Sequence, residues 1–338
     1  MSSTIRAAQT TLSENLGGIA QKAAPAGTEF SLEDVPDQTD KVAVITGGSE
    51  GIGYGVSHTL LSKNISKLFI LSVSKEVVDS AKDAVKEELG EDKAARTTWI
   101  QCDLSDWKRV VQVAKEISDS TDRLDILINN AARGIMSFQL TDYGVDRHMA
   151  VSHMGHVVLT SHLLPLLKQT AQREEFVRIV NMASNAHQQA PKETKFQSLS
   201  EINQDHGPTA IYGRAKLAAI LYSKYLSRHL PPNILANATH PGVVNTKMSL
   251  EDIHEPYPLA GYLMSTALRP FKKSQFEGAL STLYASTVTT SSGEYICPPA
   301  APEAGSEAAN SDELGENLMK LTREVTVQKG GLEPFKDY

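Results

Sequence analysis

Short apolar runs recur along the middle of the chain, and each stops at glycines or polar residues. They occupy residues 41–46, 68–71, 97–102, 126–129, 177–182 and 234–238, with a shorter run at 294–297. A continuous apolar run of this length between turn signals is typical of a strand buried on both faces of a parallel sheet. The pattern therefore predicts seven strands.

The segments between these runs have helical periodicity. They cover residues 52–63, 76–89, 106–118, 144–167 and 211–229. Regular alternation of strand and helix predicts parallel βαβ units with right-handed crossovers. Because no change of composition marks a linker inside residues 40–300, the sequence predicts one doubly wound Rossmann domain of the α/β class. Its mostly parallel, seven-stranded sheet has helices on both faces.

Three regions lie outside this alternation. Residues 1–39 are rich in Ala, Ser, Thr, Gly and Gln, and they are predicted to form a flexible extension. Residues 250–275 combine prolines with an apolar stretch, which fits either a substrate flap over the carboxyl edge of the sheet or a surface helix with one buried face. The tail, 301–338, is rich in Ala, Glu and Gly, with one helix expected over 313–325.

Composition excludes several classes of protein. The 338 residues carry a formal net charge of −7, and a nucleic-acid binder usually presents a basic face. Two cysteines cannot form a disulfide framework or a four-cysteine zinc site. No apolar stretch reaches the roughly 20 residues that cross a bilayer. A cytoplasmic location fits best, and mitochondrial import stays open because few acids accompany Arg6 and Lys22 near the start.

A glycine-rich turn follows the first predicted strand and opens the first helix. Its glycines are Gly47, Gly51 and Gly53. Glycines in this context let the backbone approach a dinucleotide pyrophosphate at a helix N-terminus. A purely structural turn is the alternative, but the strand-turn-helix setting favours cofactor binding.

The end of the second strand bears on the choice of cofactor. NAD-specific sites place an acid there to hold the ribose 2′-hydroxyl, but residues 71–75 contain no carboxylate. Lys75 is placed to pair with a 2′-phosphate instead, whereas Glu50 in the glycine turn opposes the extra charge. The sequence favours NADP, with NAD as the alternative.

Tyr212 and Lys216 are separated by four residues, which places them on one face of a helix. A free tyrosine has a pKa near ~10, and a neighbouring ammonium lowers that pKa toward neutrality. Such a pair can pass a proton to a carbonyl oxygen. An ordinary amphipathic face is the alternative. The position of Ser184 favours chemistry, because it ends the fifth strand at the edge where ligands bind.

These motifs, together with Cys102-Asp-Leu104, Asn129-Asn-Ala131 and Pro241-Gly-Val-Val-Asn-Thr246, occur in the order found in the classical short-chain dehydrogenase/reductase family, which the chain resembles. Further short stretches of the sequence are similar to those of the retinol dehydrogenase and WW-domain oxidoreductase branch of this family and its fungal members. The resemblance implies that Tyr212 is the acid/base, Ser184 the substrate-oxygen anchor and Lys216 the residue that shifts the tyrosine pKa. The cofactor contacts it implies are Thr46, Gly47, Ser49, Gly51, Ile52, Gly53, Asp103, Leu104, Asn130, Ala131, Tyr212, Lys216, Pro241, Gly242, Val244 and Thr246.

One departure from the family pattern bears on catalysis. Ser152 stands where the family usually has an asparagine that supports a water in the proton relay to the lysine. The resemblance as a whole implies an NAD(P)-dependent oxidoreductase acting on a small hydrophobic carbonyl or alcohol substrate. The alternative is a weakened cofactor sensor or scaffold. A homodimer through the helices at 144–167 and 211–229 and a monomer are both open.

Histidines concentrate near these motifs. His187 lies three residues after Ser184, where it either contacts substrate or is an ordinary loop histidine. His148, His153 and His156 share one helical region, but no acidic residues accompany them in a metal-ligating pattern. The sequence therefore predicts no metal site.

Overall fold

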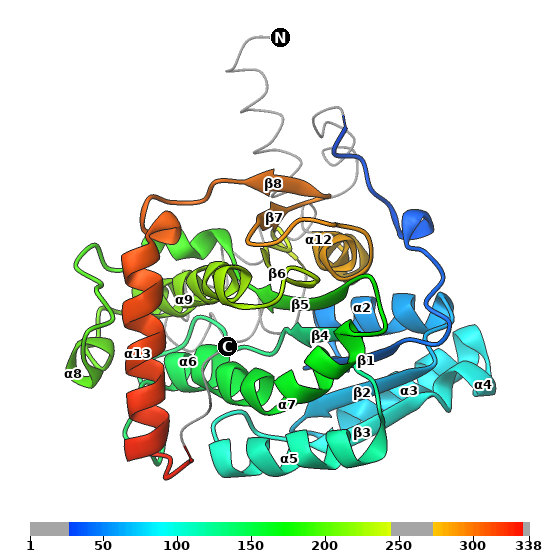
Figure 1. The fold of residues 1–338 in the computed structure, drawn as a ribbon, viewed down its shortest axis with the longest axis horizontal. Coiled ribbons are helices and arrows are strands. Elements are labelled where there is room, and N and C mark those ends of the chain that lie inside the picture. The colour runs from blue at the N-terminus through cyan, green and yellow to red at the C-terminus, as the bar shows by residue number, and fades with distance from the viewer. Residues whose placement is uncertain (1–26, 245–272, 334–338) are drawn as a thin grey trace, which may run out of the picture.

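The computed structural model describes residues 27–244 and 273–333 and contains one eight-stranded sheet (Figure 1). The strand order is β3-β2-β1-β4-β5-β6-β7-β8, and every pair is parallel except β7 with β8. The strands are β1 (Val42–Thr46), β2 (Lys67–Ser72), β3 (Thr97–Gln101), β4 (Ile126–Asn129), β5 (Val177–Met182), β6 (Ile234–Thr239), β7 (Tyr295–Cys297) and β8 (Ala301–Glu303). This is the predicted α/β class with a mostly parallel sheet.

The prediction of seven strands is wrong by one. The additional strand, β8, pairs antiparallel with β7 at the edge of the sheet, where Pro302 lies opposite Ile296. Proline is tolerated there because an edge strand does not need every backbone N–H for pairing. Three residues with a central proline give no apolar run, so the sequence pattern did not indicate a strand.

Helices cover both faces of the sheet (Figure 1). On one face lie α2 (Gly51–Ser62), α3 (Lys75–Leu89) and α12 (Gln275–Thr287); on the other lie α5 (Trp107–Ser120), α7 (Gly155–Ala171) and α9 (Pro208–His229). Alternate residues of β1 enter the two cores: Val42 and Val44 face one set of helices, whereas Ala43 and Ile45 face the other. Burial on both faces explains the continuous apolar run in the sequence.

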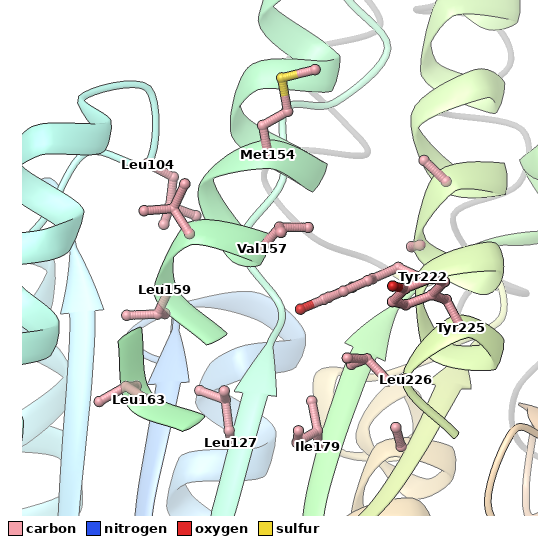
Figure 2. Close-up of a cluster of buried hydrophobic side chains, with 14 of the residues drawn as sticks. Leu104, Leu127, Met154, Val157, Leu159, Leu163, Ile179, Tyr222, Tyr225 and Leu226 are labelled. Atoms are coloured by element: carbon pink, nitrogen blue, oxygen red, sulfur yellow. The ribbon is translucent and has the colours of Figure 1, made fainter. Parts of the chain in front are cut away.

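The core under α7 and α9 is formed by aliphatic and aromatic side chains over β4 and β5. Figure 2 shows Val157 and Leu163 of α7 and Tyr222 and Leu226 of α9 among the side chains of this core. All four side chains are almost completely buried. This packing holds the two long helices against the strands whose carboxyl ends carry the candidate chemistry.

The helix predicted over 144–167 is interrupted in the structure. A short helix α6 (Arg147–Met149) is capped by Asp146, whose carboxylate accepts from the N–H of Met149 at 3.2 Å. A π-helical turn η3 (Ala150–Met154) follows, and α7 begins only at Gly155. Periodicity alone does not distinguish one long helix from helices joined by a turn with wider winding.

The C-terminal residues continue the fold. After β8 come η7 (Ala308–Asn310) and α13 (Asp312–Gln328), which agrees with the helix expected over 313–325. α13 packs against α9 (Figure 1) and places Leu318, Met319 and Val325 in the core. The shorter elements α4 (Glu91–Ala94), η4 (Asn185–Gln189) and α8 (Leu199–Ile202) lie in connecting loops.

The last part of the predicted N-terminal extension differs from a flexible arm. Residues 27–39 contain a short turn, η2 (Leu32–Asp34), and bury Phe30 and Val35 in the core. The Phe30 ring meets Tyr284 of α12 edge-on, with 5.4 Å between centroids. Residues 1–26 and nearly all of the segment predicted as a flap, 250–275, lie outside the described residues. Among the helices of the described ranges, none has the length and apolar composition that a bilayer span requires.

Candidate active site

Thr46 joins the turn after β1 to the turn after β4 at the carboxyl edge of the sheet. Its hydroxyl oxygen accepts from the backbone N–H groups of Asn130 and Ala131, both at 2.9 Å. The Asn130 amide in turn donates to the carbonyls of Thr46 at 2.9 Å and Gly47 at 3.1 Å. These bonds hold the glycine-rich turn against β4, so four sequence-predicted residues meet in one place.

The glycines of the turn are required by its backbone. Gly47 and Gly51 have φ angles of +64° and +54°, which side chains disfavour. A Cβ on Gly53 would lie 2.0 Å from the carbonyl oxygen of Gly47, so only glycine fits there. Glu50 precedes α2 in an extended conformation and makes no side-chain cap. The Glu50 side chain therefore does not cap the first N–H groups of α2, and uncapped N–H groups at a helix N-terminus are the kind of donor that binds a phosphate.

Residues predicted to lie near the adenosine follow β2 and β3. The Ser72 hydroxyl accepts from the indole of Trp99 at 3.1 Å, and Ser74 caps α3 by accepting from the N–H of Val77 at 3.3 Å. Lys75 begins α3 with an exposed side chain that pairs with Asp79. Since no carboxylate stands at residues 72–75, the end of β2 lacks the acid that would hold a 2′-hydroxyl.

The turn after β3 is close to the start of α7. The Asp103 carboxylate accepts from the N–H of Ser105 at 2.8 Å, and Leu104 is buried. A Cβ on Gly155 would lie 2.4 Å from the Leu104 carbonyl oxygen. A glycine at the first position of α7 therefore lets this turn approach the helix closely.

The fifth strand and α9 bring Ser184, Tyr212 and Lys216 into one region. The Lys216 ammonium donates to the Met182 carbonyl at 2.9 Å and lies 5.6 Å from the centroid of the Tyr212 ring. Ser184 follows β5 as the N-cap of η4, and its hydroxyl accepts from the N–H of Ala186 at 3.2 Å. Gly213 makes this approach possible, because a Cβ there would lie 2.5 Å from the Ala186 carbonyl oxygen.

Burial changes the acid–base properties of Lys216. The side chain is 3% exposed, and desolvation of the ammonium lowers its pKa to about 8. At neutral pH the lysine is still charged, and its charge favours the phenolate of a nearby tyrosine. The site therefore contains a phenol, a cation and a hydroxyl of the kind that general acid–base chemistry at a carbonyl requires.

Ser152 lies in the π-helical turn η3 rather than in a regular helix. Its hydroxyl accepts from the backbone N–H of Arg133 at 3.3 Å, which connects η3 to the loop after β4. Ser152 also lies in a tightly packed cluster with Asn129, His153, His156, Asn181, Met182, Ala219 and Tyr222. The residue that departs from the family pattern is thus part of a buried polar cluster next to the Lys216 partner, Met182.

The strand β6 is followed by the remaining predicted cofactor contacts. Gly242 has a φ of +79°, and Val244 forms a parallel bridge with Lys273. Val244 also packs against Gly278 of α12, where a Cβ would lie 2.5 Å from a valine methyl. Pro241 is described beside Gly242, whereas Thr246 lies outside the described residues.

The structure assigns local roles to histidines that the sequence left open. His187 is buried, and both ring nitrogens bind backbone: Nδ1 to the Ser184 carbonyl at 2.8 Å and Nε2 to the N–H of Ser306 at 3.0 Å. His156 meets the Thr46 hydroxyl at 2.9 Å, and His153 meets Thr322 at 2.9 Å. Within the described ranges, no group of three or more His, Cys, Asp or Glu side chains is arranged to hold a metal ion.

The sequence of the chain is similar to a family profile and to several known oxidoreductases. The short chain dehydrogenase family profile matches residues 41–256. A Neurospora crassa protein named "Putative oxidoreductase bli-4, mitochondrial" is 56% identical over 326 residues, which is 94% of this chain and 79% of that protein. Human polyprenol dehydrogenase is 30% identical over 273 residues, or 75% of each chain.

Solved structures share the fold. L-sorbose reductase from Gluconobacter frateurii, in complex with NADPH and L-sorbose, aligns with a TM-score of 0.59 over 78% of this chain and 95% of that chain, at 23% identity. A Mycobacterium paratuberculosis protein aligns with a TM-score of 0.67 over 88% of this chain and 98% of that chain, also at 23% identity. At this identity the likeness shows the fold alone.

Proposed function

The chain belongs to the short chain dehydrogenase family of NAD(P)-dependent oxidoreductases, and we propose that it reduces or forms a carbonyl group with Tyr212 as the acid/base. The observation that carries the proposal is the position of the Lys216 ammonium, buried on the Met182 carbonyl and beside the Tyr212 ring. Bound nicotinamide supplies or accepts the hydride. The protein's own residues hold the substrate oxygen and move the proton.

Each side chain has a distinct task. In the reduction direction, the Tyr212 hydroxyl gives its proton to the substrate oxygen, while the Ser184 hydroxyl donates a hydrogen bond to the same atom. The charge of Lys216 lowers the tyrosine pKa and so eases proton release. Because the pKa of Lys216 is about 8, this assistance weakens above that pH, and turnover should fall there.

We propose NADP as the preferred cofactor. The glycine turn fits a pyrophosphate, and the end of β2 offers Ser72, Ser74 and Lys75 where an NAD site would offer an acid. Lys75 pairs with Asp79, but an exposed pair of this kind contributes little stability. Breaking this pair so that Lys75 can turn toward a 2′-phosphate therefore costs little free energy.

Two matched variants test the cofactor preference. Lys75→Glu should raise the KM for NADPH at least tenfold. The KM for NADH should stay the same or decrease in this variant. Asp79→Asn should lower the KM for NADPH, because it removes the partner that competes for Lys75. Equal KM values for both cofactors in all three proteins would contradict the preference.

The substrate is proposed to be a hydrophobic carbonyl or alcohol. The apolar residues of segment 250–275 and the polyprenol in the name of the human relative support this class, as does the resemblance of sequence stretches to the retinol dehydrogenase branch. NADPH consumption with retinal, androstenedione and decanal tests it. Turnover of at least one compound is expected, and a protein that binds NADPH but turns over none would contradict the proposal.

Ser152 favours one alternative, a cofactor-binding sensor or scaffold with weakened catalysis. The substitution Ser152→Asn discriminates, because it restores the family side chain at the described position in η3. An enzyme slowed by Ser152 should gain turnover in this variant. A sensor should show no turnover in either protein.

Location and assembly are also proposals. The Neurospora relative has "mitochondrial" in its name, and the start of the chain has the few acids and scattered basic residues of an import sequence, so we propose mitochondria over cytoplasm. A fluorescent fusion with and without residues 1–39 tests this. A homodimer through α7 and α9 stays a prediction, which light scattering tests. Within the chain, α13 already packs against α9.

A further inference from the structure

The C-terminal segment, residues 301–328, contacts two turns that carry candidate catalytic serines. It comprises β8, η7 and α13. At η3, His153 meets the Thr322 hydroxyl of α13 at 2.9 Å. At the Ser184 turn, His187 meets the backbone N–H of Ser306 at 3.0 Å. In each case a buried histidine connects the serine turn to residues more than a hundred positions later in the chain.

Hydrogen-bond geometry determines which nitrogen of His153 carries its proton. The Thr322 hydroxyl donates its only proton to the Leu318 carbonyl at 2.7 Å. With that proton used at the carbonyl, the hydroxyl is assigned as the acceptor from His153, which places a proton on Nε2. Burial lowers the pKa of His153 to about 3, so the ring is neutral and carries its proton on Nε2 alone. In this contact His153 of η3 is the donor and the Thr322 hydroxyl of α13 is the acceptor.

The same reasoning gives the opposite tautomer at His187. A backbone N–H can only donate, so Nε2 of His187 accepts from Ser306 and carries no proton. The proton lies on Nδ1 and is donated to the Ser184 carbonyl at 2.8 Å. This ring therefore bridges the Ser184 turn and the C-terminal segment with both nitrogens.

Aromatic contacts restrict the two rings further. His153 meets Tyr222 of α9 edge-on, with 5.7 Å between centroids, and His187 meets Tyr295 of β7 edge-on at 5.3 Å. The Tyr295 hydroxyl also donates to the side chain of Asn185, the residue after Ser184, at 2.7 Å. Each histidine is thus held by packing as well as by hydrogen bonds. The position of the C-terminal segment therefore affects the position of the turn that carries each serine.

We propose that the C-terminal segment positions the turns that carry Ser152 and Ser184, with His153 and His187 as the positioning residues. The Ser152 turn is π-helical and the Ser184 turn is a 3-10 turn, so both have poorer internal hydrogen bonding than a regular helix. Contacts from outside therefore decide where these serines lie. The inference rests on the proposed function, because it assigns importance to the two serines through that chemistry.

Two threonines of α13 provide a matched test. Thr322→Val removes the acceptor for His153, whereas Thr326→Val removes a hydroxyl whose partners, within the described residues, are carbonyls of its own helix. Both residues are fully buried, and both changes replace a hydroxyl with a methyl. With the panel substrate that wild type turns over, Thr322→Val should lower kcat about tenfold, because small displacements of catalytic groups are costly to the rate. Its KM for NADPH should stay within twofold, and Thr326→Val should leave both constants within twofold.

Variants of His153 supply a rescue. His153→Gln places an amide N–H near the position of Nε2 and should keep most of the wild-type kcat. His153→Asn is too short to reach Thr322 and should match Thr322→Val. Equal loss of kcat in Thr322→Val and Thr326→Val, or failure of glutamine to do better than asparagine, would overturn the positioning role.

A second measurement does not depend on turnover. Nitrogen-15 NMR of histidine-labelled protein distinguishes the two neutral tautomers, and the expected result at pH 7 is Nε2–H for His153 and Nδ1–H for His187. Thr322→Val should shift only the His153 signals among these two residues. The reverse tautomers would overturn the inference, whereas loss of all turnover in the panel with correct tautomers would count against the proposed function alone.

Discussion

Lowering the pH from 7.5 to 4.5 should reduce the free energy of unfolding by about 7.5 kcal/mol through three buried histidines. Burial is the largest cause that lowers the pKa of His153, His156 and His240 to about 3. In the unfolded chain the same side chains have a pKa near ~6.5. Between these values the unfolded state binds more protons than the folded state, so stability is full above pH ~6.5 and is lost as the pH falls toward about 3.

The magnitude follows from the size of each shift. At pH 4.5 an unfolded histidine is almost fully protonated and a buried one with a pKa of about 3 is almost fully neutral, so each ring costs about 2.5 kcal/mol relative to pH 7.5. Native proteins of this kind have a total stability of about 5–15 kcal/mol. The three histidines alone should therefore bring the protein close to unfolding near pH 4.5.

Urea unfolding followed by the fluorescence of the two tryptophans, at half-unit steps of pH, measures the effect. His153→Gln keeps a donor toward Thr322 but removes one titrating ring, so it should recover about 2.5 kcal/mol of the loss at pH 4.5. His206→Gln, at a partly exposed position beside Glu193, controls for removal of a histidine. An acid loss in His153→Gln as large as in wild type would refute the claim that burial keeps His153 neutral.

Three further predictions concern the site and the core. Gly53→Ala should abolish the fluorescence enhancement of bound NADPH, since its Cβ would meet the Gly47 carbonyl at 2.0 Å; normal binding would show that the turn relaxes. Cys102 should resist iodoacetamide at pH 8 for hours by mass spectrometry, because burial raises its thiol pKa to about 12; rapid alkylation of the native protein would contradict this. Leu163→Ala, in the core of Figure 2, should lower the free energy of unfolding by about 2–4 kcal/mol in urea, and a loss under about 1 kcal/mol would mean that the core collapses around the site.

The sheet was predictable wherever a strand is buried on both faces. β4 and β5 have the bounds that the sequence indicated, because every residue in them is buried and apolar runs reveal such strands. β8 was missed because three edge residues with a central proline leave no pattern. The π-helical turn at η3 was missed because its apolar residues continue the periodicity of α7.

The candidate site was predictable where its residues are close in sequence or belong to ordered motifs. Tyr212 and Lys216 lie one helical turn apart, so their proximity follows from the helix itself. The histidine contacts were not predictable in this way, because Thr322 and Ser306 lie 169 and 119 residues after their partners. Only the packing of α13 and of the residues after β8 brings them together.

The central claim is that Tyr212 transfers the proton at the substrate oxygen, and Tyr212→Phe tests it most directly. The matched control is Tyr225→Phe on the same helix. The Tyr225 hydroxyl lies away from the candidate site and accepts a hydrogen bond from the Arg323 guanidinium, with 2.7 Å between the two atoms. Single-turnover NADPH oxidation with the panel substrate should slow about a thousandfold in Tyr212→Phe, with NADPH affinity within twofold of wild type. Tyr225→Phe should keep the wild-type rate. A Tyr212→Phe protein that turns over substrate within tenfold of wild type would contradict the account.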